Sequence, residues 1–203
     1  GRLPAAFLIW TGPVVWLVWS AVVAGLAAPA MKKLSVGAWL ANPRRSALLA
    51  ACLAALCYLV GAAALQEHVP DGDEPHYLII TQSLLGDRDL QIENNHARFD
   101  YASYLPREIK PDYLRRGVDG EIYSIHAPGV SVAVLPAFAA AGYPGAVLTI
   151  VLVVAVSMAG LWGAAWQMTS RASAAWVGWP SVVLTTPMFF HSFTIFPEGA
   201  GAA

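Results

Sequence analysis

The sequence predicts an all-α integral membrane protein with about four transmembrane helices, a large extracytoplasmic loop and short juxtamembrane helices. Of its 203 residues, 57% are hydrophobic and only 12% are charged, whereas about 25% of the residues in a soluble domain are charged. Residues 66–127 hold twelve of the thirteen acidic and six of the twelve basic residues, a net charge of −6. This concentration of charge indicates one polar loop between apolar membrane segments.

Residues 1–65 are predicted to form two transmembrane helices with a basic cytoplasmic loop between them. Residues 5–28 and 46–65 are uncharged, and each has about the 20 residues that a bilayer crossing requires. The connecting residues 31–45 carry four basic side chains and no acidic one. By the positive-inside rule this loop is cytoplasmic, so residues 66–127 emerge on the extracytoplasmic side.

The polar loop opens with three carboxylates and one imidazole within residues 71–76. Carboxylates this close repel one another, so a cation, a hydrogen-bond network or a raised pKa has to compensate. Pro75 suits the first turn of a helix, with Asp73 or Glu74 as its N-cap. Gly86 is expected to end that helix. Both carboxylates then lie at the positive end of a helix dipole.

Residues 128–203 are predicted to form a juxtamembrane or re-entrant helix and two further transmembrane helices. The apolar run 130–141 is shorter than a bilayer crossing. A Tyr-Pro-Gly break at residues 143–145 separates it from the next predicted span, residues 146–168, and the last predicted span is residues 172–190.

The course of residues 130–141 decides the side on which Glu198 emerges. If this run re-enters, Arg171 is cytoplasmic and Glu198 lies on the same side as Asp73. If it crosses, the two acids lie on opposite sides. Arg171 favours the re-entrant course by the positive-inside rule.

Three motifs in order resemble the GT-C superfamily of integral-membrane glycosyltransferases, close to bacterial protein-mannosyltransferase-like and aminoarabinose-transferase-like members. They are Gly-Asp-Glu-Pro-His-Tyr-Leu at residues 72–78, Ser-Ile-His-Ala-Pro-Gly at residues 124–129 and Phe-Pro-Glu at residues 196–198. The resemblance implies a GT-C-like N-terminal module, a fragment of a longer enzyme that is inactive alone. One departure is that no basic residue directly precedes Pro128.

The resemblance further implies a glycosyltransferase that moves a sugar from a polyprenyl-phosphate donor to a protein or glycolipid acceptor. Such an enzyme lies in the lipid bilayer of a bacterial inner membrane as a multi-pass protein with an extracytoplasmic active-site loop. The net charge of −1 gives no electrostatic support for a nucleic-acid partner.

The expected catalytic residues are Asp73, Glu74 and Glu198. Asp73 is the expected base, and Glu74 is expected to orient the acceptor or to bind a divalent cation, Mg²⁺ or Mn²⁺, together with Asp73. Burying an acid among apolar residues at membrane depth costs free energy, so Glu198 is expected to be functional. The expected substrate-binding residues are His76, Tyr77, His126, Arg107, Lys110, Arg115 and Arg116.

Simpler interpretations of the same residues stay open. Asp73 can serve only as a helix cap, His76 can be a helix-surface histidine, and the loop bases can be solvated charges. At the level of the whole protein, the alternatives are a membrane transporter or lipid-sugar flippase, in which Glu198 marks a pathway, and a non-catalytic membrane scaffold.

Overall fold

The computed structural model describes residue 20, residues 40–65 and residues 69–203. The chain divides into two compact units, residues 1–46 and residues 47–203. In the first unit the hydroxyl of Ser46 donates a 2.6 Å hydrogen bond to the carbonyl of Leu40. Apart from residue 20, the predicted span 5–28 lies outside the described residues, as does most of the basic loop. The second unit holds the polar loop and the helices that position it.

Among the described residues, two helices are long and apolar enough to cross a membrane, α3 (Pro43–Leu65) and α6 (Gly129–Thr169). The predicted span 172–190 is divided into α7 (Ala172–Val183) and α8 (Thr186–His191). Pro187 lies in the first turn of α8, where proline suits a helix start because it has no backbone N–H that needs a partner there. The four transmembrane helices therefore remain a prediction.

Helix α6 is kinked where the sequence predicts a break, which gives it a short arm before Gly142 and a long arm after it. Gly142 adopts a φ of 62° and a ψ of −146°, a conformation open mainly to glycine. A Cβ at Gly145 would lie 2.1 Å from the carbonyl oxygen of Ala137, so the two arms meet in backbone contact. The kink lies one residue before the predicted break at residues 143–145.

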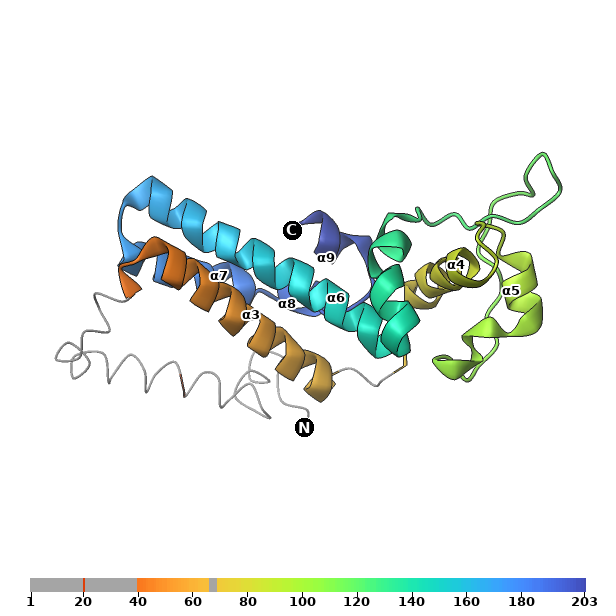
Figure 1. Ribbon diagram of the computed structural model, residues 1–203, viewed down its shortest axis with the longest axis horizontal. Helices are drawn as coiled ribbons and strands as arrows, with labels where there is room; N and C mark the ends of the chain where they lie inside the picture. Colours follow the sequence, from red (N-terminus) through yellow and green to blue (C-terminus); the bar gives the residue numbers. More distant parts are fainter. Residues whose placement is uncertain (1–19, 21–39, 66–68) are drawn as a thin grey trace, which may run out of the picture. The chain divides into compact units, whose positions relative to one another are not determined.

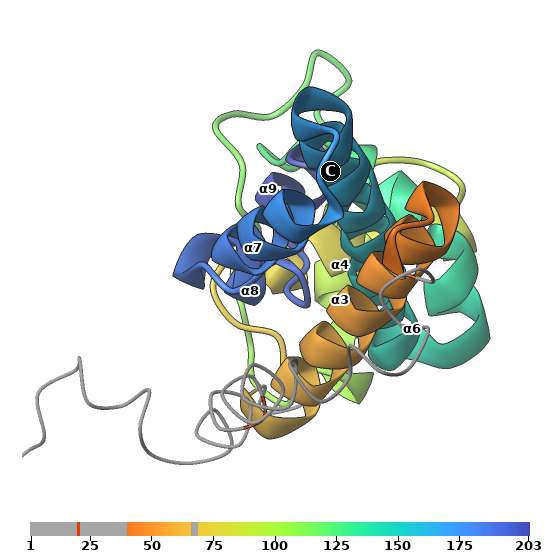
Figure 2. The ribbon, with the colours of Figure 1, turned by 90° about the vertical axis from the view of Figure 1, so that its left-hand side faces the viewer.

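The long arm of α6 packs against α7 (Figures 1 and 2). Trp162 of α6 is fully buried, and its ring centroid lies 5.6 Å from that of Trp176 in α7. Helix α3 joins this bundle through Tyr58, whose hydroxyl lies 3.5 Å from the carbonyl oxygen of Val183. The tryptophan rings and the buried Tyr58 ring belong to the apolar core of the bundle.

Helix α4 (Glu74–Gly86) begins one residue before Pro75, with Asp73 at the N-cap position, and ends at the predicted glycine. It packs on the short arm of α6 (Figure 1). The Ser131 hydroxyl donates a 2.8 Å hydrogen bond to the Tyr77 carbonyl, which also accepts one from Thr81 at 2.9 Å. Leu78 and Ile79 are almost fully buried, so α4 is an interior helix rather than a half-exposed one.

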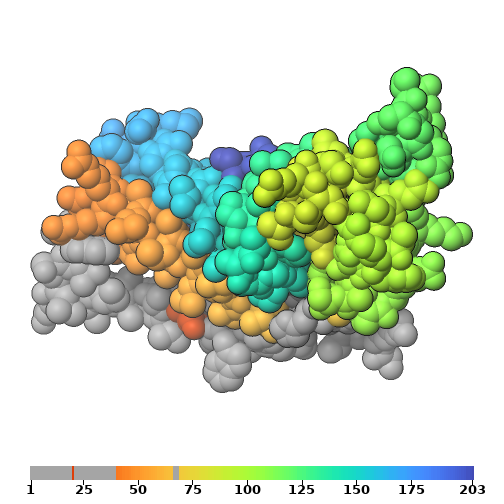
Figure 3. Space-filling view, turned by 45° about the vertical axis from the view of Figure 1, so that its right-hand side comes forward, coloured from red at the N-terminus to blue at the C-terminus, as the bar shows by residue number. Residues whose placement is uncertain are grey.

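The rest of the polar loop forms α5 (Glu93–Arg98), a 3₁₀ turn (Asp100–Ser103) and irregular chain. Arg98 pairs with Asp87 at 2.6 Å and with Asp100 at 2.9 Å. The loop surface lies beside the short arm of α6, and its green segment near residues 110–120 projects outward (Figure 3). Helix α9 (Pro197–Gly201) is the last element and packs close to α6.

Candidate functional site

A tight turn at residues 71–74 presents the three carboxylates that open the polar loop. Gly72 makes this turn with a φ of 58°, and a Cβ there would lie 3.3 Å from the Phe196 ring. The backbone amide of Glu74 donates to the Asp71 carbonyl at 3.2 Å, and Glu74 Oε2 accepts from the Asp71 amide at 3.1 Å. The turn therefore places Glu74 in the interior and leaves Asp71 and Asp73 exposed.

Glu74 is buried, with only 4% of its surface exposed. Its Oε1 accepts a 2.6 Å hydrogen bond from the backbone amide of Ile195, and the Tyr143 side chain also hydrogen-bonds to it. Burial raises the pKa of the Glu74 carboxyl, although hydrogen bonds from Ile195, Asp71 and Tyr143 oppose that shift. Glu74 thus connects three segments that are far apart in sequence.

Asp73 differs from its neighbour in every one of these respects. It occupies the N-cap position of α4, but its side chain makes no capping hydrogen bond. Its carboxylate is exposed, and the described part of the chain offers it no hydrogen bond or salt bridge. Helix capping therefore does not account for this acid, whose carboxylate is open to an incoming group.

The charges of Asp73 and Glu198 both act on the side chain of Tyr77. Only 7% of its surface is exposed, and burial raises the pKa of its phenol. Repulsion from Glu198 and then from Asp73 adds to this increase in the Tyr77 pKa. Glu198 is exposed in the first turn of α9, outside the two helices long enough to cross a membrane. The two acids thus act electrostatically on one phenol although they are 125 positions apart in sequence.

Two predicted histidines join the same cluster. The rings of His76 and His126 stack with centroids 5.3 Å apart, and the His126 ring lies 4.8 Å from that of Tyr77. His126 Nε2 lies 3.3 Å from a carboxylate oxygen of Asp112. Burial and then repulsion by His126 lower the pKa of His76, whereas Asp112 and Asp73 raise it. His76 is therefore part of a packed cluster rather than a helix-surface residue.

A cavity of about 530 Å³ opens on the Glu74 side of the turn. Its charged lining residues are Asp71, Glu74 and Arg107, and its apolar lining includes Leu65, Phe190 and Phe193. Its volume falls in the range of about 300–1,000 Å³ that small-molecule sites occupy. Asp73 is not among the lining residues.

Only one of the four basic residues expected to bind substrate lines this cavity. Arg107 does so, and its guanidinium lies 2.8 Å from Asp71. Arg116 forms a bidentate salt bridge with Glu93, with N–O distances of 2.6 and 2.7 Å. Lys110 and Arg115 are exposed and do not line the cavity.

The predicted metal pair fits a cation poorly. Both carboxylate oxygens of Glu74 already accept backbone hydrogen bonds, and Asp73 faces a different set of neighbours. Over the described ranges, no three His, Cys, Asp or Glu side chains are grouped to hold one ion. The hydrogen bonds that Glu74 already accepts therefore do not favour a shared cation, and the Asp73–Glu74 cation site stays a prediction.

Three further residues belong to this site although no sequence motif marked them: Tyr143, Ile195 and Asp112. Tyr143 falls in the Tyr-Pro-Gly break. A tyrosine hydroxyl within an apolar stretch could have indicated a buried hydrogen-bond donor there. Ile195 acts through its backbone amide, which no side-chain pattern reveals.

In comparisons with known proteins, no family model matches the chain, and no curated protein or solved structure matches it either.

Proposed function

We propose that this chain is the N-terminal module of a GT-C-like glycosyltransferase that uses a polyprenyl-phosphate sugar on the outer face of a bacterial inner membrane. The observation that carries the proposal is the exposed carboxylate of Asp73, which has no hydrogen-bond or salt-bridge partner among the described residues. Asp73 and Glu198 both raise the pKa of Tyr77. Two helices suited to a membrane support its location.

Asp73 acts as the base in this proposal. The acceptor nucleophile bonds to the anomeric carbon of the sugar, and its proton passes to the Asp73 carboxylate. The bond between that carbon and the phosphate oxygen breaks, and the polyprenyl phosphate leaves with the electron pair. A base of this kind has to come within hydrogen-bond reach of the acceptor, which an exposed carboxylate without a hydrogen-bond partner permits.

Arg107 is the proposed contact for the donor phosphate. Its present partner, Asp71, is 87% exposed at the side chain, and Arg107 itself is 60% exposed. Exposed pairs of this type contribute only about 0–1 kcal/mol, so a phosphate can replace Asp71 at little cost. The guanidinium then offers two parallel hydrogen bonds to the leaving group.

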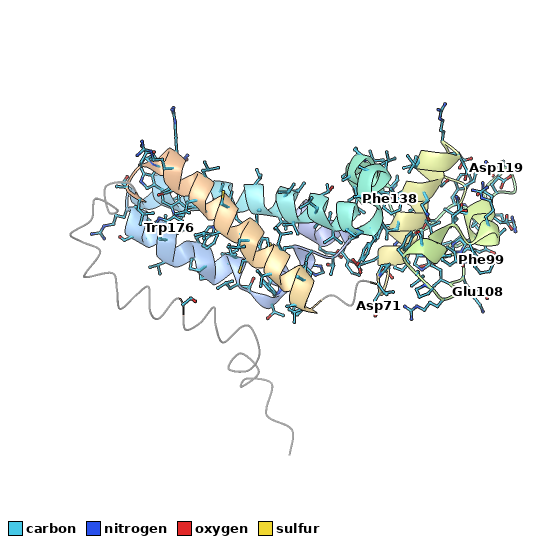
Figure 4. All side chains as sticks on the ribbon, turned by 60° about the horizontal axis from the view of Figure 1, so that its bottom comes forward. Asp71, Phe99, Glu108, Asp119, Phe138 and Trp176 are labelled. Atoms are coloured by element: carbon cyan, nitrogen blue, oxygen red, sulfur yellow. The ribbon has the colours of Figure 1, made fainter. Side chains whose placement is uncertain are left out.

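The test replaces Asp73 by Asn in the full-length protein and measures sugar transfer in membranes. We expect turnover to fall by roughly 10²–10⁴-fold, the usual contribution of a positioned base. Glu108→Gln is the matched control, because Glu108 is an exposed loop acid that lies apart from Asp71 in Figure 4. Wild-type turnover in Asp73→Asn would eliminate Asp73 as the base and leave the transport alternative standing.

A further inference from the structure

We infer that Glu74 is a positioning residue: its hydrogen bond to the Ile195 amide holds residues 193–198 against the start of α4 and thereby sets the place of Glu198. This role replaces the expected direct part of Glu74 in acceptor or metal binding. Its consequence for turnover rests on the proposed function, whereas its consequence for structure does not.

The contact between Glu74 and Ile195 is short and buried. The Oε1–N distance is 2.6 Å, Ile195 is fully buried, and Glu74 is 4% exposed. A hydrogen bond to a charged acceptor is stronger than one between neutral groups. Without Glu74 the Ile195 amide would be a buried donor lacking a partner, which is costly.

Residues 192–196, which include Ile195, lie between helices α8 and α9. Helical hydrogen bonds therefore do not fix Ile195, and a side chain from elsewhere has to satisfy its amide. Glu74 does so from 121 positions away. Glu198 follows three residues later, at the start of α9, so the anchor at Ile195 limits where its carboxylate can lie.

The turn at residues 71–74 gives different roles to adjacent acids. Glu74 points inward to Ile195 and Tyr143, while Asp73 remains exposed near Tyr77 and His76. One acid is placed to fix the geometry and the other to meet a ligand. Such division is expected of sites held in place by supporting hydrogen bonds.

Amide hydrogen exchange of the full-length protein tests the anchor directly. Glu74→Ala should speed exchange in residues 193–198 by about tenfold or more, because a buried charged hydrogen bond is lost. Glu74→Gln should retain slow exchange at Ile195, since its amide oxygen can still accept. Asp73→Ala is the matched control and should leave this segment unchanged.

Glu74→Asp covers the case in which the alanine variant unfolds, which general exchange throughout α6 would reveal. It keeps the charge but shortens the side chain by one methylene, so exchange in residues 193–198 should still rise. Unchanged exchange in both Glu74→Ala and Glu74→Asp would overturn the inference.

Turnover separates this inference from the proposed function. Glu74→Ala should reduce sugar transfer as far as Glu198→Gln does, the double variant should lose no more, and Glu74→Gln should recover most of the loss. Additive losses would overturn the inference, because Glu74 would then act independently of Glu198. Faster exchange together with full turnover in Glu198→Gln would keep the anchor and remove Glu198 from the proposed reaction.

Discussion

A Cβ atom at Gly199 would lie 2.0 Å from the carbonyl oxygen of His191. Helix α9 therefore rests on the backbone at the end of α8, and only a residue without a side chain fits there. This contact and the Glu74–Ile195 hydrogen bond flank the segment that leads into Glu198. The position of α9 is thus fixed from both sides of Pro197.

We predict that Gly199→Ala displaces α9. The methyl group meets backbone that cannot rotate away, and overpacking of this kind costs roughly 1–3 kcal/mol. Thermal unfolding should show the loss. Gly201→Ala is the control in the same helix, because a Cβ atom at that position would have nothing within 4 Å; equal melting temperatures for the two variants would contradict the prediction.

The kink in α6 gives a second matched pair of glycines. Gly145→Ala should destabilise the protein by roughly 1–3 kcal/mol, because its methyl group would lie 2.1 Å from the Ala137 carbonyl oxygen. Gly160→Ala, further along the same helix, has open space and should be neutral or slightly stabilising by helix propensity. Denaturant or thermal unfolding in detergent compares them, and a neutral Gly145→Ala would show that the arms can separate freely.

The raised pKa of Glu74 predicts a pH dependence of stability. Because folding raises this pKa above its ordinary value of 4.5, the folded state binds the proton more tightly than the unfolded state does. The stabilisation from Glu74 is therefore full below about pH 4.5 and is lost as the pH rises through the folded pKa. The pKa values of Asp71, Asp87 and Glu93 are lowered. These groups therefore make stability increase with pH, opposite to the effect of Glu74.

Glu74→Gln isolates this effect, since it removes one titrating group and leaves the others. As the pH increases above 4.5, the melting temperature of the wild type should fall relative to that of Glu74→Gln. A difference that is constant with pH would show that Glu74 has an ordinary pKa.

The histidine cluster predicts opposite shifts from two substitutions. His126→Phe keeps a ring against His76 but removes the repulsion from His126, so the pKa of His76 should rise. Asp73→Asn removes a negative charge that favours the His76 cation, so the pKa should fall. Carbon-13 NMR of labelled histidine measures both.

Burial already places the pKa of His76 below 6.5 in the folded protein. The cation therefore opposes folding, and the stability that His76 contributes is lost as the pH falls from 6.5 through the folded pKa. Shifts of the same sign in the two variants would contradict this electrostatic description.

Local signals in the sequence were enough to predict several elements. The Pro75 and Gly86 signals predicted α4 to within about a residue at each end, because proline and glycine act through their own backbone geometry. The break at residues 143–145 located the kink in α6 for the same reason. Lengths of apolar chain predicted α3 and the long arm of α6, while residues 172–190, predicted as one span, are divided into α7 and α8.

By itself, the sequence predicted the two long apolar helices α3 and α6, both ends of α4 and which residues could carry chemistry. Only the tertiary structure decided which of two adjacent acids is buried. Asp73 and Glu74 are alike in local pattern, and what distinguishes them is a backbone amide 121 positions away at Ile195. That choice depends on packing between distant segments, whose hydrogen bonds no local sequence pattern encodes.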